Sequence, residues 1–212
     1  RKEVAGSGPL GDLGAHIVDL ARFLVGEITE VVGSAKTFIK ERPLPEDDQG
    51  AWGSTAGEAK GEVTVEDAAV FLAHFANGAL GTFEATRFAA GRKNYNRFEI
   101  NGSKGSLVFN LERLNELQYF DRADRDDAQG FRTIVVTEPV HPYLSAWWPP
   151  GHIIGWEHTF IHEIKDFVEA VANDTPVQPS FRDGLQTQSV LESVLESVAR
   201  RTWTPVRNFL DA

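Results

Sequence analysis

The chain has 212 residues and a formal charge of −10, from 31 acidic and 21 basic side chains, and it contains neither cysteine nor methionine. Without cysteine there is no disulfide, no thiolate metal site and no cysteine nucleophile, and an acidic chain lacks the basic surface that nucleic acids and anionic membranes require. Its 42% hydrophobic and 25% charged residues are typical of a globular protein of one or two domains, and no apolar run approaches the ~20 residues of a membrane span.

The chain begins with charged residues, Arg1 to Glu3, and no apolar stretch follows them. We therefore expect no signal peptide and a cytoplasmic protein. Because the first residue is not methionine, we also expect these residues to be part of a longer protein.

The first predicted element is an amphipathic helix over about 14–25. Ile17, Leu20 and Leu24 recur at helical spacing, and Gly26 supplies a stop. β-Branched and small residues then predict a strand over 29–39, whereas two prolines, four glycines and many charges predict a loop over 41–61.

A series of short strands is predicted for the middle of the chain. The β-rich run from 62 to 75 is followed by Asn77-Gly78, which predicts a tight hairpin with a type I′ turn. Six or seven strands with short connections predict a largely antiparallel sheet. After the hairpin the pattern continues through Phe88, and the later strands are expected at 96–101, 106–109, 115–120 and 132–138.

Two amphipathic helices are predicted near the end, over about 156–173 and 182–202, and Ser180 with Asp183 resembles a capping box. The polar segment 121–131 is expected to be a solvated loop. The order of helix, many strands and two helices predicts an α+β fold, with a large, open-faced, mainly antiparallel sheet covered by helices on one face.

The stretch from Gly6 to Gly11 matches the glycine-rich G-x-G-x-x-G pattern that binds dinucleotide phosphates. That function needs a preceding strand and a βαβ unit, and the sequence shows neither. Pro9 also lacks a backbone N–H that a phosphate would use. The pattern therefore favours a turn that leads into the first helix.

Asp12, His16 and Asp19 follow at spacings of four and three, which place them on one helical face or its approach. A carboxylate beside an imidazole orients the ring and stabilises its charged form, which suits a base that takes a proton from an alcohol. The alternative is a helix N-cap with a half-buried, hydrogen-bonded histidine, and spacing does not separate the two.

His158 and His162 are four residues apart on a predicted helix, which is a spacing of metal ligands. A catalytic zinc needs three protein ligands and no third is fixed here, so we expect no metal and a hydrogen-bonded or solvated helix face.

The loop from Trp147 to His152 combines aromatic rings, prolines and a histidine. Aromatic faces stack on sugars and a histidine bonds a hydroxyl, so Trp148 and His152 are candidate sugar contacts. The alternative is a rigid loop whose tryptophans cap the core. Beyond the hairpin, Arg87, Arg92 and Asn94 are further candidates for substrate binding, unless they face water.

The stretch from Gly8 to Leu20 resembles the D-x-G-x-H-x-x-D segment of the glucose–fructose oxidoreductase/inositol dehydrogenase (Gfo/Idh/MocA) family. The resemblance covers nearly the whole chain, but only the family's C-terminal domain. Its other parts are Asn77–Gly81 with Glu84 and Arg87, Phe98–Leu107, Trp156–Phe167, and Pro176–Leu185.

This resemblance implies that His16 is the catalytic acid/base and that Asp12 assists it and contacts the substrate, while Asp19 has a structural or supporting role. The implied reaction is NAD- or NADP-dependent hydride transfer at a sugar or cyclitol hydroxyl. It further implies a fold like the C-terminal domain of glyceraldehyde-3-phosphate dehydrogenase, and a homodimer or homotetramer formed through the sheet face.

The family's N-terminal Rossmann domain, which binds the cofactor and carries a Glu-Lys-Pro motif, is absent from residues 1–212. We therefore expect this chain to be the substrate-binding, catalytic and oligomerisation domain of a dehydrogenase, to hold no cofactor site of its own, and to be inactive alone. The alternative is a non-catalytic sugar-binding or scaffolding module with the same fold.

Overall fold

The computed structural model describes residues 1–45 and 56–209, which form two compact units. The first contains Arg1–Ala90 and the segment from Pro179 onward, and the second contains Gly91–Gln178. All strand pairings in the described residues are antiparallel, which confirms the α+β prediction. None of the helices described is both long enough and apolar enough to cross a membrane.

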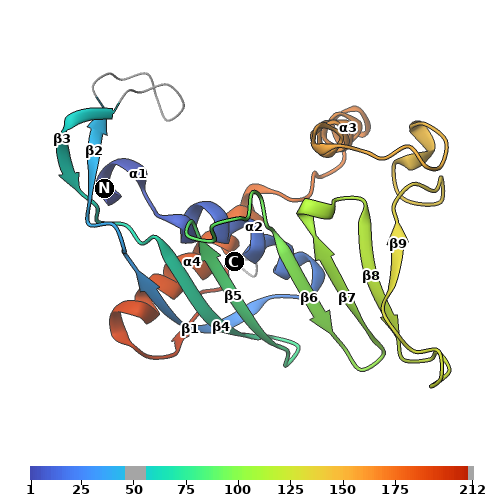
Figure 1. The fold of residues 1–212 in the computed structure, drawn as a ribbon, viewed down its shortest axis with the longest axis horizontal. Helices are drawn as coiled ribbons and strands as arrows, with labels where there is room; N and C mark the ends of the chain where they lie inside the picture. The colour runs from blue at the N-terminus through green and yellow to red at the C-terminus, as the bar shows by residue number, and fades with distance from the viewer. Residues whose placement is uncertain (46–55, 210–212) are drawn as a thin grey trace. The chain divides into compact units, whose positions relative to one another are not determined.

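The first unit contains a four-stranded sheet in the order β10-β1-β4-β5, with α2 and α4 packed against it (Figure 1). Its helices begin and end close to the predicted limits, except that α2 starts five residues earlier. The elements are α1 (Lys2–Ala5), α2 (Pro9–Leu24), β1 (Ile28–Lys36), β4 (Ala68–Phe75), β5 (Leu80–Thr86), α4 (Phe181–Arg200) and β10 (Thr204–Pro205).

The predicted loop over 41–61 is partly wrong. Residues at both of its ends form a two-stranded antiparallel ribbon of β2 (Glu41–Pro45) and β3 (Ala56–Glu62). The prolines and glycines of these segments predicted a loop. A two-stranded ribbon nevertheless accommodates them, because its strands tolerate residues that a central strand does not. The middle of the predicted loop, 46–55, lies outside the described residues.

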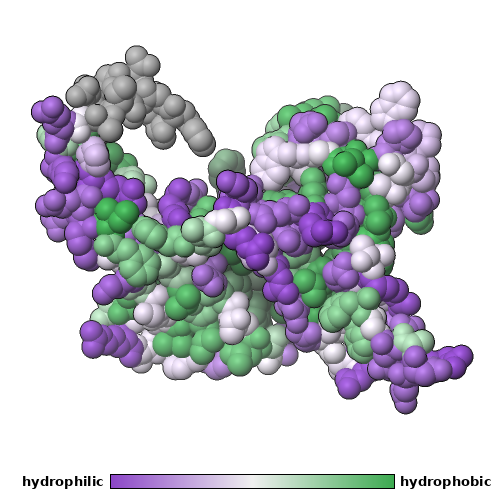
Figure 2. Space-filling view, viewed as in Figure 1, coloured by the Kyte–Doolittle hydropathy of each residue, from purple (hydrophilic) through white to green (hydrophobic). Residues whose placement is uncertain are grey.

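The core of the first unit lies between the sheet and its two helices. Alternate residues of β4 are buried, as in Ala69, Phe71 and Ala73, whereas Val70 and Leu72 lie on the other face and are 49% and 39% exposed. That other face forms a largely apolar area over β1, β4 and β5 (Figure 2). The buried cluster is completed by Leu10, Val18, Ile28, Val31, Phe75, Val190, Leu191 and Val194.

The predicted hairpin at Asn77-Gly78 joins β4 to β5, but its turn is not type I′. Among the described residues around it, only Gly78 has a positive φ, of 88°. The Gly78 N–H donates to the Phe75 carbonyl, and the Phe75 N–H donates to the Ala79 carbonyl, both at 2.9 Å. This is a three-residue loop with a type I turn and a left-handed glycine, the next most common hairpin connection.

The second unit contains a four-stranded sheet in the order β6-β7-β8-β9, followed by an irregular segment and one long helix. Among the described residues the strands thus form one four-stranded antiparallel sheet in each unit, besides the β2–β3 ribbon. The elements are β6 (Arg97–Asn101), β7 (Gly105–Asn110), the 3₁₀ turn η1 (Leu111–Arg113), β8 (Glu116–Asp121), β9 (Arg132–Val135), the 3₁₀ turn η2 (Leu144–Ala146) and α3 (Trp156–Asn173).

The predicted capping box begins α4. The Ser180 N–H donates to Asp183 Oδ2 at 2.7 Å, and the Ser180 hydroxyl accepts the Arg182 N–H at 3.2 Å. These bonds satisfy N–H groups that the first turn of a helix leaves without partners.

A buried arginine joins the end of α2 to the start of α4. The Arg22 side chain is 4% exposed and donates two hydrogen bonds to the Glu27 carboxylate, at 2.9 and 3.0 Å. It also donates to the Asp183 carbonyl at 2.9 Å and the Thr187 hydroxyl at 3.1 Å. Asp19 accepts a hydrogen bond from Thr187 at 3.4 Å and lies 3.8 Å from Arg22, so its carboxylate supports this junction.

We predict that Arg22→Ala lowers the free energy of unfolding by about 3 kcal/mol, because it leaves carboxylates without their buried partner. The matched control is Arg200→Ala, which removes an exposed ion pair with Glu196 and is expected to cost less than about 1 kcal/mol. Urea unfolding followed by tryptophan fluorescence measures both. Equal losses in the two variants would contradict the assigned role of Arg22.

Candidate active site

The candidate site begins where the main chain before β4 supports the first turn of α2. A Cβ atom on Gly8 would lie 2.2 Å from the Glu66 carbonyl oxygen, so only glycine fits at this position. Pro9 is the first helical residue, where its lack of an N–H costs nothing. The Leu10 N–H donates to Glu66 Oε1 at 2.9 Å, and this carboxylate therefore caps the helix.

This geometry excludes phosphate binding by the glycine-rich stretch from Gly6 to Gly11. The N-terminal position on α2 that would attract an anion already holds the Glu66 carboxylate. In the described part of the chain there is also no parallel βαβ unit, since all strand pairs are antiparallel. The stretch from Gly6 to Gly11 therefore does not form the phosphate-binding turn of a dinucleotide fold.

Asp12 and His16 lie one turn apart on α2, and both side chains are exposed. The Arg87 guanidinium, just beyond β5, donates a hydrogen bond to Asp12 Oδ2 and forms an ion pair with it. In the described residues no hydrogen bond involves the His16 ring. The structure thus brings Asp12 together with Arg87, and the helix leaves the His16 imidazole open on the same side.

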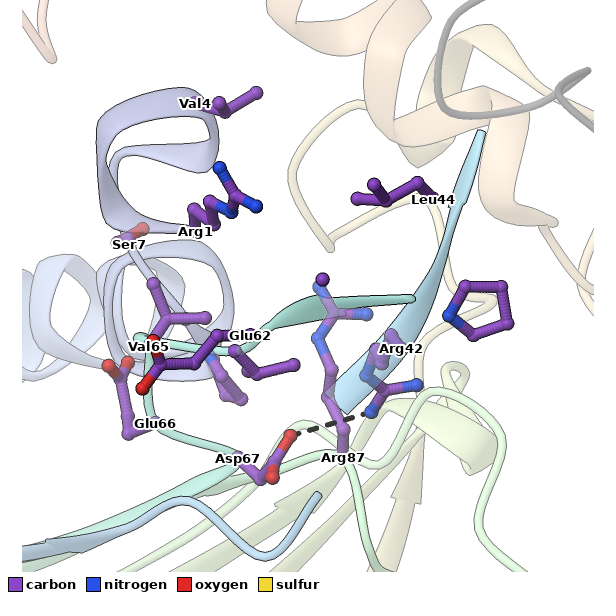
Figure 3. Close-up of a pocket in the computed structure, with 15 residues that line it drawn as sticks. Arg1, Val4, Ser7, Arg42, Leu44, Glu62, Val65, Glu66, Asp67 and Arg87 are labelled. Carbon is purple, nitrogen blue, oxygen red and sulfur yellow. Dashed lines mark hydrogen bonds and ion pairs between the residues drawn. The ribbon is translucent and has the colours of Figure 1, made fainter. Parts of the chain in front are cut away.

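A cavity of about 660 Å³ lies beside the start of α2, between α1 and the β2–β3 ribbon. The Arg42 and Arg87 side chains both reach into it, and an ion pair of 3.5 Å joins Arg42 to Asp67 (Figure 3). Arg87 therefore belongs both to this cavity and to the pair with Asp12, and the cavity borders the candidate catalytic residues.

Asp67 fixes the base of this cavity. Its carboxylate is 6% exposed and accepts the N–H groups of Phe38 and Ile39 at 2.7 and 2.9 Å, with Arg42 at 3.5 Å. Its carbonyl accepts the Arg87 N–H at 3.2 Å. Burial raises the pKa of Asp67, but the Ile39 and Phe38 N–H groups and the Arg42 guanidinium outweigh it, so the pKa lies below its usual value.

The second unit holds the other candidate sugar contacts. The Trp148 side chain is 74% exposed, and its ring lies 6.0 Å from the ring of His152. The His152 Nδ1 donates to the Pro149 carbonyl at 2.8 Å, which directs the opposite ring nitrogen outward. The structure thus brings Trp148 and His152 together on one exposed loop.

The two remaining candidates of this unit have different surroundings. The Arg92 guanidinium stacks 3.8 Å from the centre of the Tyr95 ring and lies 3.6 Å from the Glu112 carboxylate. Asn94 is exposed, and its side chain makes no hydrogen bond to another described residue. Nothing here couples Arg92 or Asn94 to the Trp148 loop.

His158 and His162 serve the packing of α3. The Trp147 indole N–H donates to His162 Nε2 at 2.7 Å, and the Gly155 N–H donates to His158 Nδ1 at 3.0 Å. Burial and the neighbouring His158 lower the pKa of His162, so this ring is neutral near pH 7. Within residues 1–45 and 56–209, no group of three or more histidine, aspartate or glutamate side chains is placed to hold a metal.

Sequence reasoning missed Glu66, Asp67 and Arg42. Their contacts join residues 25 to 56 positions apart, and no local pattern records such a contact. A signal for the earlier start of α2 was present, because proline favours the first turn of a helix.

The model of the GFO/IDH/MocA C-terminal domain matches residues 1–108. The chain belongs to the GFO/IDH/MocA family. It is 46% identical to the levoglucosan dehydrogenase of Pseudarthrobacter phenanthrenivorans over 209 residues, which are 97% of this chain and 53% of that protein. This result confirms the family resemblance that we noted for the segment from Gly8 to Leu20.

Solved structures agree with this assignment to the GFO/IDH/MocA family. An oxidoreductase domain protein from Kribbella flavida is 55% identical, with a TM-score of 0.89 over 98% of this chain and 53% of that one. Levoglucosan dehydrogenase in complex with NADH and levoglucosan is 44% identical, with a TM-score of 0.88 over 99% of this chain and 53% of that one. The chain spans about half the length of the curated relatives it matches.

We predict that Gly8→Ala lowers the free energy of unfolding by about 1–3 kcal/mol, because the new methyl group collides with the Glu66 main chain. The control is Gly184→Ala on α4, where no atom lies within 4 Å of the new Cβ. That control is expected to stabilise the protein by about 0.5–1 kcal/mol through helix propensity. Urea unfolding compares the two, and a neutral Gly8→Ala would contradict the close approach.

We also predict a pH signature for Asp67. Because its folded-state pKa is lowered, its stabilising contribution is complete above its unfolded pKa near ~3.9 and is lost as the pH falls through the folded value. The stability difference between the parent and Asp67→Asn should be constant above about pH 5 and shrink below about pH 4. Urea unfolding from pH 2.5 to 7 measures it, and a difference that persists unchanged at pH 2.5 would refute the role.

Proposed function

We propose that the chain is the sugar-binding and proton-transfer half of an NAD-dependent dehydrogenase of the levoglucosan dehydrogenase type. The observation that carries this proposal is the joint presentation of Asp12, His16 and Arg87 beside α2, in a chain 46% identical to a levoglucosan dehydrogenase. The substrate class is an uncharged sugar or cyclitol, with levoglucosan as the first candidate.

Oxidation of a secondary alcohol removes a proton from the oxygen and a hydride from the carbon. In this proposal, residues of this chain accept the proton. The His16 imidazole is exposed and engaged by no other described group, so it is free to accept the hydroxyl proton. Asp12, held by Arg87, offers its other carboxylate oxygen to a neighbouring hydroxyl.

NAD would supply the hydride acceptor, since the levoglucosan dehydrogenase structures contain NADH. The described strands form no parallel βαβ unit, so we propose that the cofactor binds mainly to an N-terminal Rossmann domain in the full-length protein. The length of the relatives, about twice that of this chain, supports this arrangement. Residues 1–212 alone are then inactive.

We further propose that Trp148 and His152 contact the sugar, because an exposed indole face beside an imidazole suits a hydroxyl-rich ring. We propose the same role for Arg92 and Asn94. The open sheet face, with Val70 and Leu72 half-exposed and Leu80 65% exposed, supports a homodimer or homotetramer. Analytical ultracentrifugation of the full-length protein tests this assembly.

We predict that His16→Asn in the full-length protein lowers kcat for NAD-linked levoglucosan oxidation by about 10²–10⁴-fold, with a smaller change in KM. The loss follows from removal of the group that accepts the hydroxyl proton. The assay follows NADH absorbance over a panel of sugars and cyclitols that includes levoglucosan.

The matched control is His141→Asn, since His141 only accepts a hydrogen bond from the Glu138 N–H at 3.3 Å. It should leave kcat within about twofold, because the change removes one hydrogen bond to the main chain from a half-buried side chain and no group that handles the proton. Full activity of His16→Asn on every substrate would instead favour a non-catalytic sugar-binding module.

A further inference from the structure

Helix α3 contacts its own unit through a polar side. His162 accepts the Trp147 indole N–H at 2.7 Å, and the ring of His158 lies 4.5 Å from that of Trp147. One turn further along, Asp166 accepts the Tyr143 hydroxyl. The three helix residues follow at i, i+4 and i+8, so they form one stripe along the inward side of α3.

A second stripe of large apolar residues runs along the opposite side. Phe160 and Ile164 each come two residues after a contact residue, about 200° round the helix. All members are between 47% and 66% exposed, and α3 has no buried residue. The α3 apolar stripe consists of Trp156, Phe160, Ile161, Ile164, Phe167, Val168 and Val171.

The other long helices show what such a pattern normally does. Helices α2 and α4 each bury a row of apolar residues, among them Val18 and Leu191, in the core of the first unit, although Phe23 and Phe181 near their ends are exposed. The three aromatic members of the α3 apolar stripe present roughly 300 Å² of apolar surface, about half of ~200 Å² each, and four partly exposed aliphatic side chains add to this area. Monomers seldom leave patches above a few hundred Å² open, whereas interfaces between domains of one chain bury about 600–1,500 Å².

We propose that the α3 apolar stripe is the surface on which the nucleotide-binding half of the full-length enzyme docks. The inference rests on the proposed function, because it takes its partner from the second half that the relatives' length implies. Such docking also gives α3 a function that its polar contacts do not explain: it fixes the nucleotide-binding half against the sugar-binding half.

Charge argues against a second copy of this chain as the partner. Two acidic side chains of α3, Glu157 and Glu163, border the stripe, so a two-fold symmetric pairing of α3 helices would bring acidic groups together. The other acidic side chains, Asp166 and Glu169, lie on the inward side, and Lys165 pairs with Glu169 at 2.7 Å. A partner with basic residues around an apolar patch complements this surface.

The test uses thiol labelling, because residues 1–212 contain no cysteine. Ile164→Cys and Phe167→Cys are made in the full-length protein, and peptide mass mapping separates them from any thiol elsewhere. The matched control is Ile153→Cys, on the loop before α3 and 74% exposed. We expect maleimide to react at 164 and 167 at least tenfold more slowly than at 153, at every protein concentration.

Equal rates at the three positions would overturn the proposal, as would protection that disappears on dilution, which indicates a second copy. Benzoylphenylalanine in place of Ile164 then identifies the neighbour. Photocrosslinks to peptides upstream of Arg1 support the proposal, and crosslinks within residues 1–212 or to a second copy overturn it. Neither readout depends on turnover, so an inactive enzyme with a protected stripe refutes the proposed function alone.

Discussion

The arrangement of the candidate site depends on one close contact, between Gly8 and the main chain of Glu66. Because Gly8 has no side chain, the first turn of α2 lies directly on the segment that leads into β4. The Glu66 carboxylate then reaches the Leu10 N–H and caps the helix. This contact fixes where α2 starts and therefore which way Asp12 and His16 face, one and two turns further on.

Asp67, the residue after Glu66, holds two further segments of the chain in place. The Asp67 carboxylate holds the N–H groups of Phe38 and Ile39, where the chain leaves β1 for the β2–β3 ribbon. Its carbonyl holds the N–H of Arg87, whose guanidinium reaches Asp12. Two consecutive residues thus support the start of α2, the base of the ribbon and the end of β5. The buried carboxylate is stable there because N–H donors and Arg42 replace the water it loses.

The glycine-rich stretch shows how the same local sequence serves different chemistry. In a dinucleotide fold, such glycines let main-chain N–H groups surround a phosphate. Here a glycine permits close approach too, but the approaching group is the protein's own main chain, and a side-chain carboxylate occupies the helix end. The position that would attract an anion is occupied by the protein's own Glu66 carboxylate, so the glycine-rich stretch does not bind a cofactor phosphate.

Sequence patterns predicted those helices and strands in which the spacing of apolar residues follows the buried side of the element. The limits of α3 agree with the predicted 156–173, and the capping box at Ser180 and Asp183 is present. The β2–β3 ribbon was missed because its prolines and glycines carry no strand pattern, and the turn at Gly78 was given the wrong type because Asn-Gly occurs in more than one hairpin loop. Spacing singled out Asp12 and His16 as candidates, whereas Glu66 and Asp67 belong to contacts that only the folded chain creates.

Helix α3 shows another limit of sequence-based prediction. Its residue pattern predicted the helix correctly, but the pattern does not identify the surface that the apolar side contacts. A repeat of apolar residues every 3.6 positions indicates that one side of a helix is apolar. It does not indicate which surface covers that side. In α2 and α4 the covering surface is the sheet of the same unit. In α3 the polar stripe meets its own unit and the apolar stripe is exposed, the reverse of what a surface helix requires. An 18-residue helix gains little stability from propensity alone, and the docking that we propose would supply the packing that this apolar side needs.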